Sequence, residues 1–280
     1  MEIVFDKVSF VINQGTRLEK TILNDISFNI IDSGIYSFVG ASNSGKTAIG
    51  DLINAIVSPT KGEVRLGKFK NNGKRIRNVN ALRKQTGYVY KNPYDMFFNK
   101  TVLKEISFGM KHFKYKTEKI DTRVNDSLKL VGLDLSYLNR NPMELSLIEA
   151  KKVALACVLI YNPKVIILDE YTNGLSASDK EELARLLKLL KNKYKKIIIL
   201  LSKDTSFVYS ITDYVYLMHL TRIISEGKKI ILESDNRLKD IGLEPPKIVS
   251  FVNACNKKGH EINQYTNILD LIKGVYRDVF

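Results

Sequence analysis

Eight consecutive residues, Gly40 to Thr47, have the types and the spacing needed to bind phosphate groups. Their sequence, GASNSGKT, matches the P-loop pattern G-x-x-x-x-G-K-[ST]. The glycines permit backbone torsions that turn successive N–H groups inward, Lys46 can reach the β- and γ-phosphates, and Thr47 offers a hydroxyl to Mg²⁺. The expected ligand is a nucleoside triphosphate with magnesium, bound by Gly40, Ala41, Ser42, Asn43, Ser44, Gly45, Lys46, Thr47 and Ala48.

A pair of carboxylates follows a strongly apolar run later in the chain. Residues 165–168 predict a buried strand, and Asp169 and Glu170 come directly after it. On its own, such a run most often means a strand that ends in solvent-facing acids. After a P-loop, this Walker B pattern instead predicts that Thr47 and Asp169 hold the metal, in the case of Asp169 often through water. Glu170 would then orient or deprotonate the attacking water.

The elements that must position these residues flank them in the sequence. A β-branched and aromatic run, Ile35 to Val39, precedes the P-loop, and apolar residues at helical spacing follow it. Further patterns predict antiparallel strands within 2–34, strands at 63–66, 86–90 and 196–202, a polar connection at 68–78, and helices within 101–138 and 144–160. The fold class is therefore α/β, a P-loop NTPase core sheet with an antiparallel β subdomain, an inserted α-helical subdomain and a small C-terminal unit.

Composition and length fit one large domain with an extension. The chain has 280 residues, of which 44% are apolar and 26% charged, as in globular proteins. We expect an ATP-binding domain over 1–233, with its helical subdomain at about 94–160, and a C-terminal helical extension over 234–280. The sequence contains no run of about 18 apolar residues and its first residues do not form a signal peptide. Cys157 and Cys255 lack the spacing of a metal site or a disulfide framework.

The net charge of +14 is the one unusual bulk property. It favours anionic partners, but its lysines and arginines occur in dispersed clusters at 68–77, 111–119 and 188–196. A solvated basic surface is the interpretation that this dispersion favours. Contact with an anionic membrane face comes second, and specific nucleic-acid binding is the least favoured.

Two later segments, taken with the P-loop, carry a resemblance to a known family. Residues 144–154 have the sequence ELSLIEAKKVA and residues 166–176 have the sequence IILDEYTNGLS. In this order they resemble the corresponding segments of an ABC-transporter ATPase, and the resemblance covers nearly the whole chain. It is most similar to the paired ATPase subunits of energy-coupling-factor transporters, on the basis of GTRLE at 15–19, VYKNP at 89–93, Phe108-Gly109, VGL at 131–133 and IGLEPP at 241–246.

The resemblance implies a function and a set of partners. ATP and Mg²⁺ would be the cofactors, each nucleotide lying between the P-loop of one subunit and the signature segment, with Ser146, of the other. The partners would be a second ABC ATPase subunit in a head-to-tail heterodimer, a transmembrane coupling subunit and a membrane protein that captures a vitamin or metal ion. The chain would be peripheral at the cytoplasmic face of the cell membrane, and its C-terminal extension would contact the second ATPase.

The signature segment departs from the family pattern. The family sequence L-S-G-G-Q is Leu145-Ser146-Leu147-Ile148-Glu149 here. Two glycines whose backbone approaches the γ-phosphate of the partner's nucleotide have become bulky, and a neutral glutamine has become an anion that would face another anion.

Residues that arrange water and nucleotide in the family are also changed. Lys91 replaces the glutamine that senses Mg²⁺ and water, and Lys203 replaces the switch histidine. A lysine at 203 can neutralise phosphate charge but cannot accept a proton while ionised. The remaining changes are Ile12 for the adenine-stacking tyrosine, with Phe10 the nearest aromatic, Tyr171 for a proline and Ser176 for an aspartate.

These departures predict an ATP-binding subunit whose own hydrolysis is impaired. Two other interpretations stay open. A soluble ABC-fold ATPase that acts on nucleic acid or translation is permitted by the charge, although such proteins usually carry two ATPase modules in one chain. A structural pseudo-ATPase is permitted by the altered motifs, although Lys46, Thr47, Asp169 and Glu170 argue against it.

Overall fold

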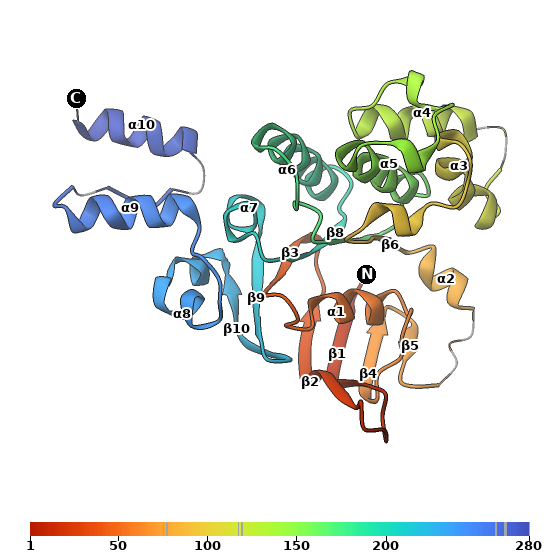
Figure 1. The fold of residues 1–280 in the computed structure, drawn as a ribbon, viewed down its shortest axis with the longest axis horizontal. Helices are drawn as coiled ribbons and strands as arrows, with labels where there is room; N and C mark the ends of the chain where they lie inside the picture. Colours follow the sequence, from red (N-terminus) through yellow and green to blue (C-terminus); the bar gives the residue numbers. More distant parts are fainter. Residues whose placement is uncertain are drawn as a thin grey trace.

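A six-stranded sheet forms the centre of the computed structural model, which describes residues 1–74, 76, 78–116, 118, 120–260, 262–265 and 268–279 (Figure 1). The strand order is β10-β9-β3-β8-β7-β6, and all strands run parallel except β10, which is antiparallel to β9. Every residue of β7 and β8 is buried, as in parallel strands covered on both faces. The strands are β3 (Gly34–Val39), β6 (Thr86–Val89), β7 (Val165–Asp169), β8 (Ile197–Ser202), β9 (Tyr214–His219) and β10 (Arg222–Lys228).

A second, antiparallel sheet packs against the P-loop helix α1 (Lys46–Ile53). Its order is β2-β1-β4-β5, formed by β1 (Ile3–Ile12), β2 (Lys20–Ile30), β4 (Lys61–Leu66) and β5 (Phe69–Asn71). Phe28 of this sheet, Phe38 of β3 and Leu52 of α1 belong to one buried cluster. The predicted antiparallel β subdomain is therefore confirmed, and its core is continuous with that of the central sheet.

The chain between β6 and β7 forms the predicted helical subdomain. Helices α3 (Val102–His112), α4 (Ile120–Leu130) and α5 (Leu147–Leu159) lie together on one side of the molecule in Figure 1. Their buried apolar residues form one cluster with β7 and with α6 (Ala177–Asn192), which follows β7 in the chain. Helix α7 (Thr205–Ile211) follows β8. The helical subdomain is thus packed onto the sheet that carries the Walker B residues.

The C-terminal helices lie at the opposite end of the molecule in Figure 1. They are α8 (Asp235–Asp240), α9 (Lys247–Lys257) and α10 (Ile268–Val279). Leu238 and Val249 share a buried cluster with Val39 of β3, so the start of this unit is anchored beside the P-loop strand. Within the described ranges, no helix is long and apolar enough to cross a membrane.

The structure differs from the sequence-based elements in the region expected to be a polar connection at 68–78. It contains β5, and α2 (Val79–Arg83) follows with Asn78 as its N-cap. β5 was missed because it has only three residues, and the buried Asn71 owes its place to side-chain bonds with the carbonyls of Leu52 and Val57. Arg75, Arg77 and Lys119 of the basic clusters lie outside the described residues.

Two predicted helical stretches are also shorter than expected. The pattern within 101–138 forms two separate helices, α3 and α4. The helix expected from residue 144 begins at Leu147, because Ser146 caps it and Pro142–Glu144 forms a turn of 3-10 helix instead.

Candidate functional site

The P-loop and three predicted site residues follow the strands of the central sheet at one edge. The P-loop follows β3, Asp169 ends β7, Lys203 follows β8, and Lys91 comes two residues after β6. Pairing of Asp169 with Leu201 keeps the ends of β7 and β8 in register. This carboxyl edge of parallel strands is where open α/β sheets bind ligands.

Both P-loop glycines stand where a side chain would collide with backbone atoms. A Cβ at Gly40 would lie 2.5 Å from the carbonyl oxygen of Met218, and one at Gly45 would lie 2.7 Å from that of Ile22. Gly45 also has a φ of 97°, in the left-handed region. The loop therefore requires glycine at both positions. Its tip residues Ser42 and Asn43 are exposed, and Ala48 is buried in the first turn of α1.

The ammonium group of Lys46 is enclosed by the P-loop. Its Nζ donates to the carbonyl oxygens of Gly40 at 2.7 Å and Ala41 at 2.9 Å, and to Ser44 Oγ at 3.4 Å. The residue is only 5% exposed, and Nζ lies 3.5 Å from Glu170 Oε1. Burial lowers the pKa of Lys46, and the charge of Glu170 opposes that shift. The loop thus fixes a cation at its centre, where a polyphosphate would need one.

Thr47 and Asp169 form the candidate magnesium site. Thr47 Oγ1 donates to Asp169 Oδ2 at 2.8 Å, and the phenol of Tyr88 lies 3.3 Å from the same oxygen. Within the described residues, Asp169 Oδ1 is buried and has no hydrogen-bond partner. Burial raises the pKa of Asp169. A hydroxyl and a carboxylate oxygen are the hard donors that Mg²⁺ prefers, so these residues fit a magnesium ion and would hold it if it bound with a nucleotide.

Glu170 has a strained backbone that turns its carboxylate toward the P-loop. Its φ is 43°, which is uncommon for a residue with a side chain, and its N–H donates to Leu201 O at 2.8 Å. While Oε1 faces Lys46, Oε2 accepts a long 3.4 Å bond from the backbone N–H of Lys203. The side chain of Lys203 is exposed. Both predicted catalytic residues therefore lie next to the phosphate loop.

The other predicted nucleotide contacts stand outside this cluster. Phe10 is half-buried on β1, against the apolar cluster that also contains Ala48. Lys91 is exposed, and Ser146 caps α5 in the helical subdomain. Across the described ranges, neither Lys91 nor Ser146 has a hydrogen bond or ion pair to the P-loop. The predicted role of Ser146 toward another subunit's nucleotide stays a prediction.

Comparisons with known proteins agree with this geometry. The family model described as "ABC transporter" matches residues 23–173. The chain belongs to the ABC transporter family. It is 32% identical to the energy-coupling factor transporter ATP-binding protein EcfA2 of Caldanaerobacter subterraneus subsp. tengcongensis, over 92% of this chain and 91% of that protein. It is 31% identical to EcfA2 of Clostridium acetobutylicum, over 94% of this chain and 93% of that protein.

Solved structures of ABC ATPases share the fold. CbiO1 from Clostridium perfringens, whose structure is described as part of the ABC transporter complex cbiONQ, aligns with a TM-score of 0.73 at 26% identity. That alignment covers 90% of this chain and 98% of CbiO1. A dimeric structure of the bacterial ABC transporter cassette MJ0796 aligns with a TM-score of 0.75 at 24% identity, over 81% of this chain and 98% of that chain. The predicted family and fold class are confirmed, and the chain is an ATP-binding component of energy-coupling-factor type.

In this ABC ATPase the carboxylate of the signature segment is used within its own helix. Glu149 Oε2 accepts from the backbone N–H and the hydroxyl of Ser146 at 2.8 and 2.7 Å, and Oε1 accepts from the Tyr137 hydroxyl at 2.6 Å. Hydrogen bonds from Tyr137 and Ser146 lower the pKa of Glu149 to about 2. Arg140 Nη1 lies 3.9 Å from Glu149 Oε1. The carboxylate therefore stays ionised but is turned back onto its own helix. It forms a capping box with Ser146, which the sequence pattern S-x-x-E could have indicated.

The residues in place of the signature glycines pack in two ways. Leu147 is 42% exposed, and its Cδ2 would lie 3.1 Å from a Cβ on Gly174, in the loop after Glu170. Ile148 is half-buried. The signature segment of this ABC ATPase therefore carries apolar bulk on the surface and against the loop that follows Walker B.

Lys151 is a functional candidate that the sequence reasoning missed. It is 2% exposed on α5, and its Nζ donates to the carbonyl oxygens of Tyr171 at 2.7 Å and Asn173 at 2.5 Å. Burial lowers its pKa to about 8, against the charge of Glu170. Lys151 thereby joins α5, the signature helix that begins within the signature segment, to the loop after Glu170. A lysine in an amphipathic run usually faces solvent, so no sequence signal identified it.

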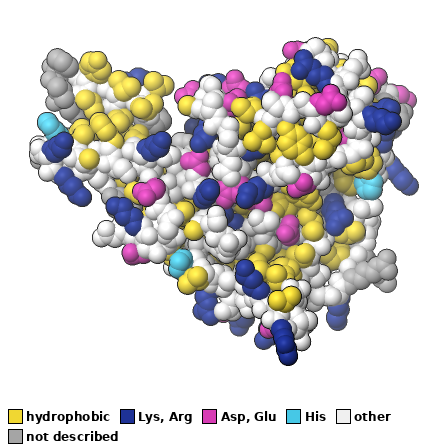
Figure 2. Space-filling view, viewed as in Figure 1, with side chains coloured by type: hydrophobic (Ala, Val, Ile, Leu, Met, Phe, Trp, Pro, Cys, Tyr) yellow, Lys and Arg dark blue, Asp and Glu magenta, His cyan; other side chains and the backbone are white. Residues whose placement is uncertain are grey.

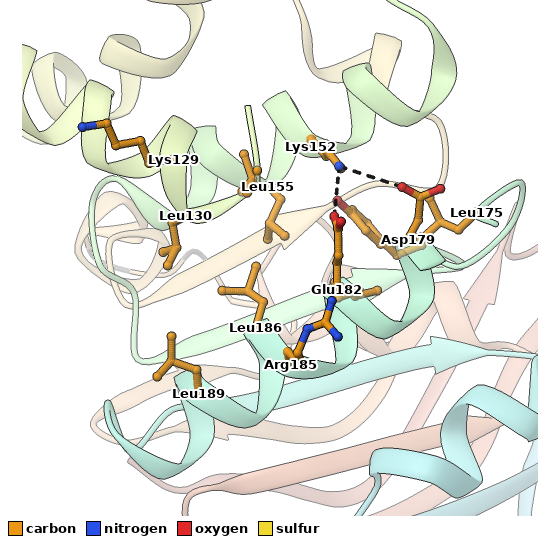
Figure 3. A pocket seen from close by; sticks show the side chains of 14 residues that line it. Lys129, Leu130, Lys152, Leu155, Leu175, Asp179, Glu182, Arg185, Leu186 and Leu189 are labelled. Atoms are coloured by element: carbon orange, nitrogen blue, oxygen red, sulfur yellow. Dashed lines mark hydrogen bonds and ion pairs between the residues drawn. The ribbon is translucent and has the colours of Figure 1, made fainter. Parts of the chain in front are cut away.

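A cavity of about 310 Å³ lies between α4, α5 and α6, away from the P-loop (Figure 3). Leucine is the commonest residue in its wall, and Lys152, which also lines it, has its Nζ 3.2 Å from Glu182 and 3.8 Å from Asp179. Figure 3 shows these ion pairs bridging α5 to α6. Consecutive lysines of the ABC signature helix thus contact different parts of the chain after Walker B.

Proposed function

We propose that this chain is the ATP-binding subunit of an energy-coupling-factor type importer and pairs head to tail with a second, sibling ATPase. Binding and hydrolysis of ATP between the subunits would drive uptake of a vitamin, metal ion or other micronutrient through a transmembrane coupling subunit and a substrate-capture protein. The observation that carries the proposal is the assembly of Lys46, Thr47, Asp169 and Glu170 at one edge of the sheet, in a chain related to EcfA2 proteins.

The geometry supports binding of Mg²⁺–ATP. Phosphate oxygens would compete with the carbonyls of Gly40 and Ala41 for the N–H groups of Lys46. The positive end of α1 and the inward N–H groups of the loop favour the same anion. Magnesium, when bound with the nucleotide, supplies charge neutralisation at the phosphates, and Thr47 and Asp169 would hold it.

Hydrolysis by this subunit is proposed to be slow. Glu170 faces the P-loop and can serve as base, but the positions that arrange water and the γ-phosphate in the family carry Lys91 and Lys203. An ionised lysine attracts phosphate without accepting a proton. Loss of such positioning groups typically costs about 100-fold or more each.

The site on the sibling's P-loop, completed by this chain's signature segment, is proposed to be altered more. Leu147 and Ile148 would stand where two glycines allow the backbone to approach the γ-phosphate. The exposed bulk of Leu147 supports this steric interpretation. Glu149 contributes less repulsion than its charge suggests, because its own helix binds it.

The C-terminal extension is proposed to contact the sibling ATPase. An apolar groove of about 640 Å³ lies between α9 and α10 and the flank of α6 and α7, and Figure 2 shows hydrophobic side chains gathered over this end of the molecule. Phe251 and Ile268 are 51% and 64% exposed in it. The extension begins beside the P-loop, where a Cβ on Gly242 would lie 3.8 Å from Ala41 Cβ. A partner that closes the nucleotide site would therefore also reach this unit.

The proposed location follows from these partners. A peripheral subunit at the cytoplasmic face of the cell membrane would be held there by the transmembrane coupling subunit. The basic surface would add weak attraction to anionic lipids.

The test is ATP turnover by the assembled complex, with Glu170→Gln in this chain and, separately, the equivalent change in the sibling. We expect Glu170→Gln to leave Mg²⁺–ATP binding unchanged and to lower turnover less than the sibling's change does. Turnover that vanished with Glu170→Gln alone would overturn the proposal of slow hydrolysis. If this chain turned over ATP rapidly as a stable homodimer, the proposal that it pairs with a sibling ATPase would be overturned.

A further inference from the structure

The Walker B aspartate has a second neighbour besides Thr47, and the proposed function does not use it. Tyr88, the third residue of β6, lies with its hydroxyl 3.3 Å from Asp169 Oδ2 and 3.5 Å from the carbonyl oxygen of Thr47. The residue is 5% exposed, and a phenol is protonated at neutral pH, so it acts as a donor toward the carboxylate. The first of these atoms belongs to the candidate magnesium site, and the second is a backbone oxygen of the P-loop helix.

A glycine in the P-loop helix makes room for this phenol. Gly50 lies in α1, and a Cβ there would come within 2.9 Å of both Cζ and the hydroxyl oxygen of Tyr88. Glycine is among the least favourable residues in a helix interior, so its presence there calls for a local reason. Its φ is not in the left-handed region, and space is therefore the reason that the structure offers.

The two hydroxyl groups approach the same oxygen of the Asp169 carboxylate and, in the part of the chain that the structure describes, leave the other oxygen without a donor. Thr47 and Tyr88 both approach Oδ2, whereas Oδ1 is buried and, within the described residues, has no hydrogen-bond partner. Donors on one oxygen restrict rotation of the group, so the other oxygen keeps a fixed direction. Groups that orient a metal-associated carboxylate in this way contribute to metal affinity.

We propose that Tyr88 is a positioning residue for magnesium, admitted by Gly50, whose phenol fixes the orientation of Asp169 before Mg²⁺–ATP binds. The inference rests on the proposed function, because it assumes that the P-loop binds ATP with magnesium. It assigns Tyr88 no contact with the metal or the nucleotide. Its effect passes through the carboxylate of Asp169, and its loss should weaken magnesium binding more than nucleotide binding.

Tyr88→Phe removes the hydroxyl and keeps the ring. Binding of a fluorescent ATP derivative to the purified full chain would be titrated with Mg²⁺, and also measured in EDTA. We expect the Mg²⁺ concentration at half-maximal effect to rise about 10-fold, within the range seen when groups that orient metal ligands are removed. Affinity in EDTA should change less than twofold.

Tyr90→Phe is the matched control. Tyr90 is half-buried, and its ring lies edge-on to that of Tyr88, with centroids 4.8 Å apart. The Tyr90→Phe variant also loses a phenol hydroxyl, two residues away from Tyr88, and should leave the Mg²⁺ midpoint unchanged.

Gly50→Ala tests the same contact from the other side. The added methyl must displace the phenol, so the Mg²⁺ midpoint should rise as in Tyr88→Phe, and the two changes together should exceed the larger single effect by less than twofold. An unchanged midpoint in Tyr88→Phe, or a lower melting temperature without a change in midpoint, would overturn the positioning role. If the wild-type chain bound no ATP derivative with or without Mg²⁺, the proposed function itself would fail, which is a distinct result.

Discussion

The P-loop and the signature segment of this subunit differ in how strictly they keep the glycines of the ABC family. At Gly40 and Gly45 a side chain would meet backbone oxygens of the same chain within 2.7 Å. At the signature segment, Leu147 and Ile148 occupy the glycine positions, and α5 still forms with a complete capping box. The P-loop glycines are required by the fold of this chain. The signature glycines are not required in this way, because α5 forms without them.

This comparison separates two kinds of functional residue. Groups that bind this chain's own nucleotide are held by internal contacts, such as the bonds from Lys46 to the P-loop carbonyls. Residues at the signature positions, which we propose face the sibling's nucleotide, are exposed or half-buried and are held by contacts within their own helix. Changes at the first region should therefore have larger effects on the isolated chain than changes at the second.

The largest expected effect comes from Lys46→Ala. Truncation removes a buried cation that the phosphates would need, and losing one partner of a buried charge pair costs about 3 kcal/mol or more, or at least about 100-fold in affinity. Titration calorimetry of ATP with the purified chain would measure it. Lys203→Ala, at an exposed side chain, should lower affinity less than about 10-fold. Equal effects of the two changes would contradict the central role of the enclosed lysine.

The contact between the helix of the signature segment, α5, and the loop after Glu170 gives the next largest effect. Lys151→Met keeps the length of the side chain but removes the donors to Tyr171 O and Asn173 O. Unpaired buried carbonyls cost about 1–3 kcal/mol each, and relief of a buried charge offsets part of this, so we expect a loss of about 2 kcal/mol in the free energy of unfolding. Denaturant unfolding would measure it.

Lys152→Met is the matched control for that change. Lys152 neighbours Lys151 in sequence, but its side chain is 21% exposed and pairs with Asp179 and Glu182 near solvent. Ion pairs of this kind contribute less than about 1 kcal/mol. A loss at Lys152 as large as that at Lys151 would show that the loop after Glu170 does not depend on the buried donor.

The sequence predicted the parts of the site that recur as short motifs. The P-loop and the Asp169-Glu170 pair were placed correctly because both follow apolar strands, and parallel strands bring their carboxyl ends to one edge. The order of the strands, with β3 between β8 and β9, depends on long-range pairing that no local pattern encodes.

What the sequence did not predict depends on contacts between distant segments. Lys151, Tyr88 and Gly50 gain their roles from residues between 20 and 81 positions away, and each resembles an ordinary helix or strand residue in isolation. Glu149 is different, because the capping box lies within four residues and could have been predicted from the sequence pattern S-x-x-E. Comparison with the family pattern drew attention to its charge instead of its local partner.

A smaller effect is expected from restoring the signature glycines. Leu147→Gly with Ile148→Gly removes the bulk that would face the sibling's γ-phosphate, and we expect turnover at that site to rise about 10-fold, which is the effect of about 1.4 kcal/mol. ATP turnover by the assembled complex would measure the gain. The same change combined with glutamine at the sibling's Walker B glutamate should show no gain. A gain that persisted there would place the effect at this chain's own site instead.

The smallest expected effect concerns the carboxylate that replaced the signature glutamine. Glu149→Gln weakens the capping box and should lower the free energy of unfolding by about 1 kcal/mol at pH 7. The pKa of Glu149 is about 2 in the folded chain and ordinarily 4.5, so its stabilising effect is present above 4.5 and is lost as the pH falls toward 2. The difference between wild type and variant should therefore shrink across that window, as measured by denaturant unfolding at several pH values. Glu144→Gln, at a side chain that accepts a hydrogen bond from Asn141, is the control and should change stability by less than about 0.5 kcal/mol. If Glu149→Gln showed a difference that was independent of pH, the carboxylate would not be the group that caps the helix, and its charge would again be available to oppose the sibling's nucleotide.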